Sequence, residues 1–431
     1  MMQSRSQTSK SLPAPPGLRT SLILTLLALN LAVSGMAQEA ADPPRWAIPV
    51  DGDPFPARVQ AIDKDWKITF QANGRQRVFT AQDLVGWGDY RDTCTHSQIV
   101  LADGGLLVAD VMQLSGESLV AYGDLCGQVT WPLSAVRGVL VDPPLQPLRR
   151  DRLLETIHSA HGTEDQLRLD NEDVIAGTLK SWCAVPDAAA DRPATIALAT
   201  TGRDLQVPAD TVVALILNPA LVRLSKPREA VVEMGFRDGS LLRVIKVATA
   251  GATTRLTLPG ALELELATDV LCRELTLLRP NGNRVAYLSD LPPIGYKHIP
   301  LLESPWPLQP DRSAAGGRLR HGGHVFTKGL GMHSTSRVAY DLDGQYRRFQ
   351  AEIAVDDDAG PRGAVTVRVL FEAAQGQWQR AFESDVIRGG APPLPIAVDV
   401  TGVKRMALIV DFAERGDVLD HADWLNARLI K

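Results

Sequence analysis

Two consecutive β-strand patterns stand in the segment FQAEIAVDDDAGPRGAVTVRVLF, residues 349–371. Both halves place apolar residues at every second position: Phe349, Ala351, Ile353 and Val355, then Val365, Val367, Val369 and Phe371. Successive side chains of a strand point to opposite faces, so this period of two predicts half-buried strands. Two further alternating runs follow at 396–400 and 406–412, and the latter is apolar almost throughout. Together they predict a β-sandwich of about 150 residues in which the last run lies centrally.

A shorter pattern recurs four times between residues 49 and 277. Each copy begins with a turn that contains Asp and usually Gly, and each closes with a short alternating strand that ends in Val or Leu. The turn aspartates are Asp51, Asp103, Asp170 and Asp238. Asp-Gly between apolar runs predicts a hairpin, because glycine readily adopts the positive φ of a tight turn. The recurrence predicts four small antiparallel β units, of the SH3-like half-barrel kind, packed in series.

The patterns divide the chain into four parts. These are a leader at 1–37, two β units at 38–145, two further β units at 146–280, and a β-sandwich at 281–431 with a Pro- and Gly-rich lead. A helix is predicted from Arg150, with Asp151 as its N-cap, to connect the second and third units. Trp306 is expected to anchor the lead. The predicted fold class is all-β, repeated small antiparallel units followed by the sandwich.

The leader has the features of an export signal. Basic residues precede an apolar segment at 21–33, and small residues follow it. An uncleaved membrane anchor is the alternative, but this segment is shorter than the about 20 apolar residues that span a bilayer. We therefore expect an exported protein, periplasmic, cell-surface or extracellular, with no membrane association after cleavage.

Composition argues against several function classes. The net charge is -5 with acidic and basic residues interspersed, so nucleic acid is not an expected partner. The four cysteines form no CxxC pair, which disfavours zinc, and the sequence leaves open whether they form disulfides, such as Cys94–Cys126, or stay free. The HxxH pair His158 and His161 has no third ligand nearby.

Two motifs resemble a known family. KGLG at 328–331, followed by His333 and Ser336, and DHADW at 420–424 occur in the order typical of the NPCBM family of carbohydrate-binding modules. The resemblance covers residues 283–431. It implies a galactose-binding-like jelly-roll β-sandwich, often with a structural calcium ion, that binds sugar at loops on one edge.

The predicted carbohydrate site combines both motifs. Its members are His333, Asp420, His421 and Trp424. An aromatic face can stack on a pyranose while carboxylate and imidazole groups bind hydroxyls. Each residue also has a structural interpretation: Trp424 as a core residue, and His333 as a tie between the Gly turn and the DHADW segment. Gly329 and Gly331 either form a turn or let backbone carbonyls approach a ligand closely.

A calcium site is predicted from the acidic residues of the same region. Its candidate ligands are Asp356, Asp358, Asp423 and Asn426. Carboxylate and carbonyl oxygens suit a hard cation, although the family commonly has a carboxylate where Asn426 stands, which would weaken the site. A solvated acidic turn is the alternative.

These observations favour an exported, non-enzymatic protein that binds carbohydrate at edge loops of the sandwich, with the repeats as a platform. Two alternatives stay open: a structural or protein-interaction protein of the cell envelope, and a glycoside hydrolase or accessory protein with its active site in the repeats. No GxSxG, HExxH, P-loop or GxGxxG motif occurs in a fitting context.

Overall fold

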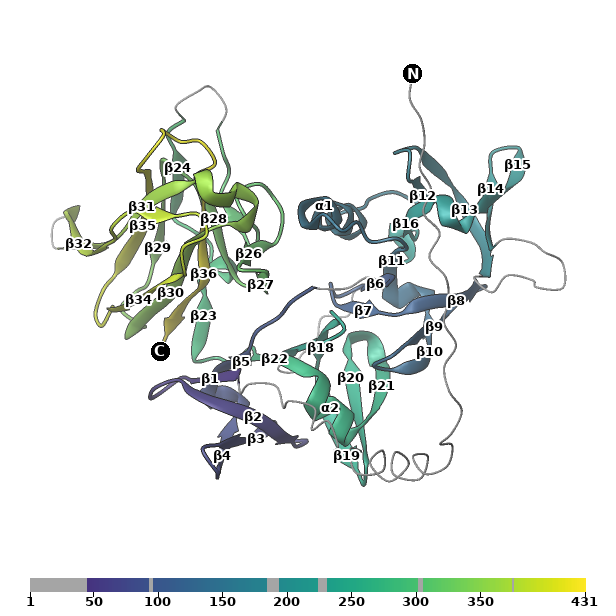
Figure 1. Cartoon of the computed structure of the whole chain (residues 1–431), viewed down its shortest axis with the longest axis horizontal. Helices are drawn as coiled ribbons and strands as arrows, with labels where there is room; N and C mark the ends of the chain where they lie inside the picture. The colour runs from purple at the N-terminus through teal and green to yellow at the C-terminus, as the bar shows by residue number, and fades with distance from the viewer. Residues whose placement is uncertain (1–44, 93–95, 184–193, 224–230, 301–304, 374–375) are drawn as a thin grey trace, which may run out of the picture. The chain divides into compact units, whose positions relative to one another are not determined.

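The computed structural model describes residues 45–431, apart from 93–95, 184–193, 224–230, 301–304 and 374–375 (Figure 1). The predicted export signal lies outside the described residues. Nearly all regular structure is antiparallel β, so the predicted all-β class is confirmed. None of the described helices has the length and apolar composition needed to cross a membrane.

The four copies fold alike. In each, the first strand pairs with the second and with the last, and a 3-10 turn precedes that last strand in the first three copies. The first copy comprises β1 (Arg45–Pro49), β2 (Phe55–Ile62), β3 (Lys67–Ala72), β4 (Arg75–Thr80), η1 (Ala81–Asp83) and β5 (Leu84–Gly88). The second comprises β6 (Gln98–Leu101), β7 (Leu106–Val108), β8 (Asp110–Ser115), β9 (Ser118–Gly123), β10 (Gly127–Pro132), η2 (Leu133–Ala135) and β11 (Val136–Leu140).

The third and fourth copies repeat this plan, and helix α1 (Pro147–His158) precedes the third. The third comprises β12 (Asp165–Leu169), β13 (Val174–Cys183), β14 (Thr195–Thr200), β15 (Arg203–Pro208), η3 (Ala209–Thr211) and β16 (Val212–Ile216), followed by η4 (Pro219–Leu221). The fourth comprises β17 (Val232–Phe236), β18 (Leu241–Val244), β19 (Lys246–Ala250), β20 (Thr253–Leu258), η5 (Pro259–Ala261), β21 (Leu262–Ala267), α2 (Thr268–Glu274) and β22 (Leu275–Pro280). The predicted turn aspartates each lie between the first two strands of a copy.

The predicted packing of the copies in series is wrong. β5 of the first copy pairs with β22 of the fourth, and β8 and β11 of the second pair with β13 and β16 of the third. β7 of the second copy also pairs with β18 of the fourth. Outer strands carry unpaired N–H and C=O groups, and pairing between copies satisfies them whatever the order of the copies in the chain. Apolar side chains of all four copies share one core. The domain boundaries given above stay a prediction.

The last third is a two-sheet sandwich. One sheet contains β23 (Val285–Tyr287), β25 (Gln309–Pro310), β28 (Gly329–His333), β36 (His421–Ile430), β30 (Arg348–Val355) and β34 (Leu394–Asp399). The other contains β24 (Gly295–His298), β29 (Ser336–Asp341), β35 (Arg405–Phe412), β31 (Ala364–Glu372), β32 (Trp378–Glu383) and β33 (Ile387–Arg388). Outside these sheets lie η6 (Leu288–Asp290), the hairpin of β26 (Leu319–His321) and β27 (His324–Phe326), and η7 (Asp357–Arg362).

The alternating runs form the sandwich core as predicted. Phe349, Ile353 and Val367 are buried, and β35 lies between β29 and β31, which is the central position expected of the most apolar run. Phe412, at the end of that run, is instead exposed. It lies beyond the covered part of the sheet.

Helix α1 corrects one prediction. Gln146, not Asp151, is its N-cap residue. Asp151 lies inside the helix, where its carboxylate accepts hydrogen bonds from the Arg318 backbone N–H at 2.9 Å and from the Arg320 guanidinium at 2.8 Å. The residue that resembled a cap therefore joins α1 to the lead of the sandwich. Cys126 and Cys272 are free thiols among the described residues, and Cys94 of the suggested Cys94–Cys126 pair lies outside them.

Candidate functional site

The two family-like motifs lie on neighbouring strands. β28 and β36 pair in antiparallel register, which sets His333 directly opposite His421 and Gly331 opposite Asp423. Ser334 Oγ donates a hydrogen bond of 2.7 Å to Asp420 Oδ2. The structure thus brings together three of the four residues predicted to bind carbohydrate, His333, Asp420 and His421.

Asp420 is buried and its oxygens are already occupied. Besides Ser334, the backbone N–H of Ala364 donates to Asp420 Oδ1 at 2.9 Å. Burial raises the pKa of the Asp420 carboxyl, and these hydrogen bonds oppose that rise. Its contacts tie three segments of the sandwich edge together.

The stacking role predicted for Trp424 does not fit its position. The side chain is 0% exposed, and its ring lies 6.4 Å from that of Phe349 in the core between the sheets. Register explains this, because residues at alternate positions of a strand share a face. Trp424 lies on the same strand as Asn426 and Ala427, and its side chain faces the core. Its indole therefore offers no surface to a saccharide.

A different tryptophan covers the motif histidines. Trp306, from the Pro-rich lead, stacks on His333 with ring centroids 4.4 Å apart and planes 10° apart. It also lies against His421 at 5.5 Å. Its backbone is held by two bonds: the Trp306 N–H donates to His298 Nδ1 at 3.1 Å, and the Tyr296 hydroxyl donates to the Trp306 carbonyl at 2.9 Å. The sequence indicated Trp306 only as an anchor of the lead.

The partners of the imidazoles indicate their tautomers. His298 accepts at Nδ1, so its Nε2–H donates to the Ser334 carbonyl at 3.1 Å. The same carbonyl accepts from His333 Nδ1 at 2.6 Å. Burial is the main cause that lowers the pKa of His333, which favours the neutral ring. His333 and His421 are 4% and 6% exposed, so the lead largely covers the predicted edge site.

Three of the four predicted calcium ligands converge. Asp356 and Asp423 are buried, and Asp358 accepts a hydrogen bond of 2.9 Å from His421 Nδ1. Burial, together with neighbouring Asp358, raises the pKa of Asp356 to about 7, and burial with the charges of Asp356 and Asp358 raises that of Asp423. For Asp358 burial is also the largest cause, but the hydrogen bonds with His421 and Asp356 together with the His421 charge outweigh it, and the pKa is lowered.

Asn426 does not join this group. Its backbone N–H donates to the Lys328 carbonyl at 2.9 Å and its carbonyl accepts from Arg428 at 3.1 Å, and no contact between Asn426 and the three carboxyl groups occurs among the described residues. Within the same residues no set of three or more His, Cys, Asp or Glu side chains has the spacing of a metal site. In favour of a cation, both carboxyl oxygens of Asp423 are buried and accept no hydrogen bond from the described residues.

Calcium therefore stays a prediction, which a stability measurement can test. A bound ion would hold the β30–η7 turn against β36 through Asp356, Asp358 and Asp423. With a dissociation constant of about 0.1–1 mM, about 10 mM calcium should stabilise the folded chain by about 1–3 kcal/mol over chelator, seen as a higher Tm. Asp423→Asn should abolish this rise. A wild-type Tm that is the same in calcium and in chelator would contradict the prediction.

Comparison with known families adds to this geometry. Residues 284–430 match the NPCBM/NEW2 domain. The resemblance seen in the KGLG and DHADW motifs is thereby confirmed for the last third of the chain. Carbohydrate binding by the NPCBM/NEW2 segment is supported by this match.

Two curated relatives match over about a quarter of the chain. Alpha-1,3-galactosidase B of Akkermansia muciniphila is 29% identical over 120 residues, 27% of this chain and 14% of that protein. A Renibacterium salmoninarum protein named "Putative endo-alpha-N-acetylgalactosaminidase" is 31% identical over 115 residues, 27% of this chain and 7% of that protein. The chain thus spans only a small part of these relatives' length.

Two solved structures are similar to part of this chain at low scores. A Clostridium perfringens GH95 CBM51 in complex with methyl-galactose is 22% identical, with a TM-score of 0.29, over 34% of this chain and 99% of that one. CBM51-2 with GlcNAc and INT domains of C. perfringens ZmpB is 24% identical, with a TM-score of 0.30, over 44% and 40%. At these scores we draw no argument from them.

Proposed function

We propose that the chain is an exported, non-enzymatic carbohydrate-binding protein whose NPCBM/NEW2 segment binds a glycan at the edge formed by Trp306, His333 and His421. The family match supports the ligand class, and the observation that carries the location is the Trp306 indole stacked on His333. Trp306 takes the aromatic role first assigned to Trp424. Its partly exposed indole supplies an apolar surface for a pyranose face, and the imidazoles beneath it keep the ring in place.

The ion pairs of a pocket in the repeats support a role in binding rather than catalysis. Two glutamates that line it, Glu155 and Glu233, form ion pairs with Arg312 and Arg279. Neither is therefore a free carboxyl of the kind that a glycosidase uses as general acid or base. The repeats then act as a platform for the sandwich.

Glycan-array binding of the full chain tests the location. Trp306→Ala should weaken the retained glycans at least about tenfold, or ~1.4 kcal/mol, because the stacking surface is lost. Trp378→Ala is the matched control, since Trp378 is 40% exposed on the other sheet and does not contact the histidine cluster. Unchanged Tm values show that both variants fold.

Three results would count against the proposal. A folded chain that retains no glycan refutes carbohydrate binding at this edge. If glycan binding is lost in Trp378→Ala but kept in Trp306→Ala, the binding surface lies on the outer face of the second sheet. Hydrolysis of a retained glycan by the wild-type chain refutes the non-enzymatic role.

A further inference from the structure

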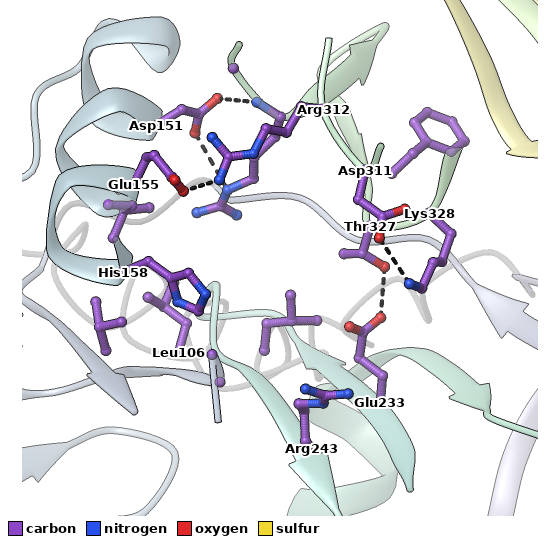
Figure 2. A pocket seen from close by; sticks show the side chains of 18 of the residues that line it. Leu106, Asp151, Glu155, His158, Glu233, Arg243, Asp311, Arg312, Thr327 and Lys328 are labelled. Atoms are coloured by element: carbon purple, nitrogen blue, oxygen red, sulfur yellow. Dashed lines mark hydrogen bonds and ion pairs between the residues drawn. The ribbon is translucent and has the colours of Figure 1, made fainter. Parts of the chain in front are cut away.

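A pocket of about 410 Å³ lies apart from the Trp306 edge, where repeats and sandwich lead meet (Figure 2). Four segments form it: the β6–β7 hairpin around Asp103, helix α1, the β17–β18 hairpin, and the lead around Asp311–Lys328. Its volume falls within the about 300–1,000 Å³ typical of small-molecule sites. The family match does not extend to the repeats, so this pocket is a candidate site separate from the edge site.

The pocket walls hold opposite charges in closed pairs. On one wall Glu155 pairs with Arg312, and on the other Lys328 Nζ lies 2.8 Å from Asp311 Oδ2 (Figure 2). Thr327 Oγ1 donates to Glu233 at 2.7 Å. Five carboxyl and four basic side chains line the pocket. Because these charges nearly balance, the pocket has little attraction for a strongly anionic or cationic ligand.

Two lining groups have hydrogen-bonding capacity left. Asp103 Oδ1 accepts the Gly105 N–H at 2.9 Å, whereas Asp103 Oδ2 accepts nothing from the described residues. The His158 ring likewise makes no hydrogen bond within the described part of the chain, and it points into the pocket (Figure 2). Burial raises the pKa of Asp103 and lowers that of His158, so burial favours the uncharged form of both.

The turn is shaped to bring these two groups together. Gly104 has φ +90°, and a Cβ there would lie 3.3 Å from His158 Cε1. Only glycine combines this backbone conformation with so close an approach of the ring. Arg243 Nη1 donates to the Asp103 carbonyl at 2.9 Å and adds a donor beside them. Apolar side chains also line the pocket, among them Leu106, Leu241 and Phe326.

We infer that this pocket binds a neutral, polyhydroxylated ring, a monosaccharide or the terminal sugar of a glycan, through His158, Asp103 and Arg243. Hydroxyls both donate and accept, which suits a pocket lined by a free acceptor, an imidazole and a guanidinium. The C–H face of the ring packs on the apolar side chains. Near-balanced charge then selects neutral sugars over uronates and phosphates.

Titration calorimetry on the full chain tests this inference with five probes: galactose, glucose, N-acetylglucosamine, glucuronate and inorganic phosphate. At least one neutral sugar should bind, and glucuronate and phosphate should bind at least about tenfold more weakly. His158→Ala and Asp103→Asn should each weaken the sugar about tenfold. Asp103→Asn keeps an acceptor for the Gly105 N–H, so the turn itself is preserved.

Matched controls come from the same chain. His161→Ala removes an exposed histidine three residues away, and Asp170→Asn removes the equivalent turn aspartate of the third copy; both should leave affinity unchanged. Trp306→Ala distinguishes this pocket from the edge site, because pocket binding should survive it. Three outcomes overturn the inference: no neutral sugar binds, a charged probe binds more tightly, or binding is lost with Trp306→Ala and kept in His158→Ala.

Discussion

Replacing Arg320 by Ala should lower the free energy of unfolding by about 3–5 kcal/mol, the cost of leaving buried charges without their partner. Arg320 Nη1 and Nη2 each lie 2.7 Å from an oxygen of Asp92, and Nη2 lies 2.8 Å from Asp151 Oδ1. All three side chains are buried. Arg150 contributes one further bond, of 2.9 Å, to Asp92. Without Arg320, the carboxylates of Asp92 and Asp151 would keep Arg150 and Arg318 as ion-pair partners but would lose three buried, charge-assisted hydrogen bonds.

The measurement is urea unfolding followed by tryptophan fluorescence. Arg388→Ala is the matched control, because Arg388 forms an exposed ion pair of 2.6 Å with Glu414, and such pairs contribute less than about 1 kcal/mol. Arg320→Lys should fall between Arg320→Ala and wild type, since it keeps the charge but loses the two-pronged contact with Asp92. An Arg320→Ala chain as stable as the Arg388→Ala chain would contradict the prediction.

Acid provides a second measurement of the same cluster. Burial alone would raise the pKa of Asp92, but Arg320, Arg318 and Arg150 outweigh it and hold that pKa well below its usual 3.8. A carboxyl with a lowered pKa stabilises the fold above its unfolded pKa, and that contribution is lost as the pH falls toward the folded value. Wild type should therefore lose stability steeply below about pH 4, and Arg320→Ala should show a shallower slope there.

The sequence predicted the parts of the fold that depend on local pattern. The period of two in residues 349–355 and 365–371 placed strands and their buried faces correctly, because the pleat alone determines which side chains share a face. The four turn aspartates correctly indicated four copies of one folding unit, because a turn between two apolar runs is also a local pattern. Pairing between copies was missed, since β5 and β22 meet across most of the chain and no local pattern indicates which edges pair.

The sequence likewise predicted the candidate site only as far as local patterns and motifs allow. The motif order led to the prediction that His333, Asp420 and His421 lie together, and the β28–β36 pairing places them beside one another, whereas their role in binding stays a prediction. Trp424 was predicted to stack on a sugar but lies in the core, whereas Trp306 was predicted only to anchor the lead but covers the motif histidines. Composition does not distinguish a tryptophan inside an alternating strand from one in an irregular lead. Only the three-dimensional position separates a core ring from a covering one. Asp151 was predicted to be a helix cap because no sequence pattern indicates that it contacts residues 318 and 320.

Gly331→Ala should destabilise the sandwich by at least about 3 kcal/mol, more than the ~1–3 kcal/mol usual for overpacking. Gly331 has no positive φ, so the turn interpretation does not apply to it; close packing does. A Cβ at this position would lie 2.2 Å from the Arg312 carbonyl oxygen and 2.6 Å from the Ala314 nitrogen. Both are backbone atoms, which cannot relieve the clash by a change of rotamer as a side chain can. The carbonyl that approaches this glycine belongs to the chain's own lead.

Gly295→Ala is the matched control for the same urea experiment. Gly295 also lies in a sandwich strand, β24, has no positive φ, and a Cβ there would meet nothing within 4 Å. Its cost should stay within about 0.5 kcal/mol. Because the Gly331 contact holds residues 312–314 on β28, Gly331→Ala should also loosen the lead and expose Trp306 to solvent, seen as a red shift of tryptophan emission. Equal stability of the two variants would mean that the lead does not pack on β28.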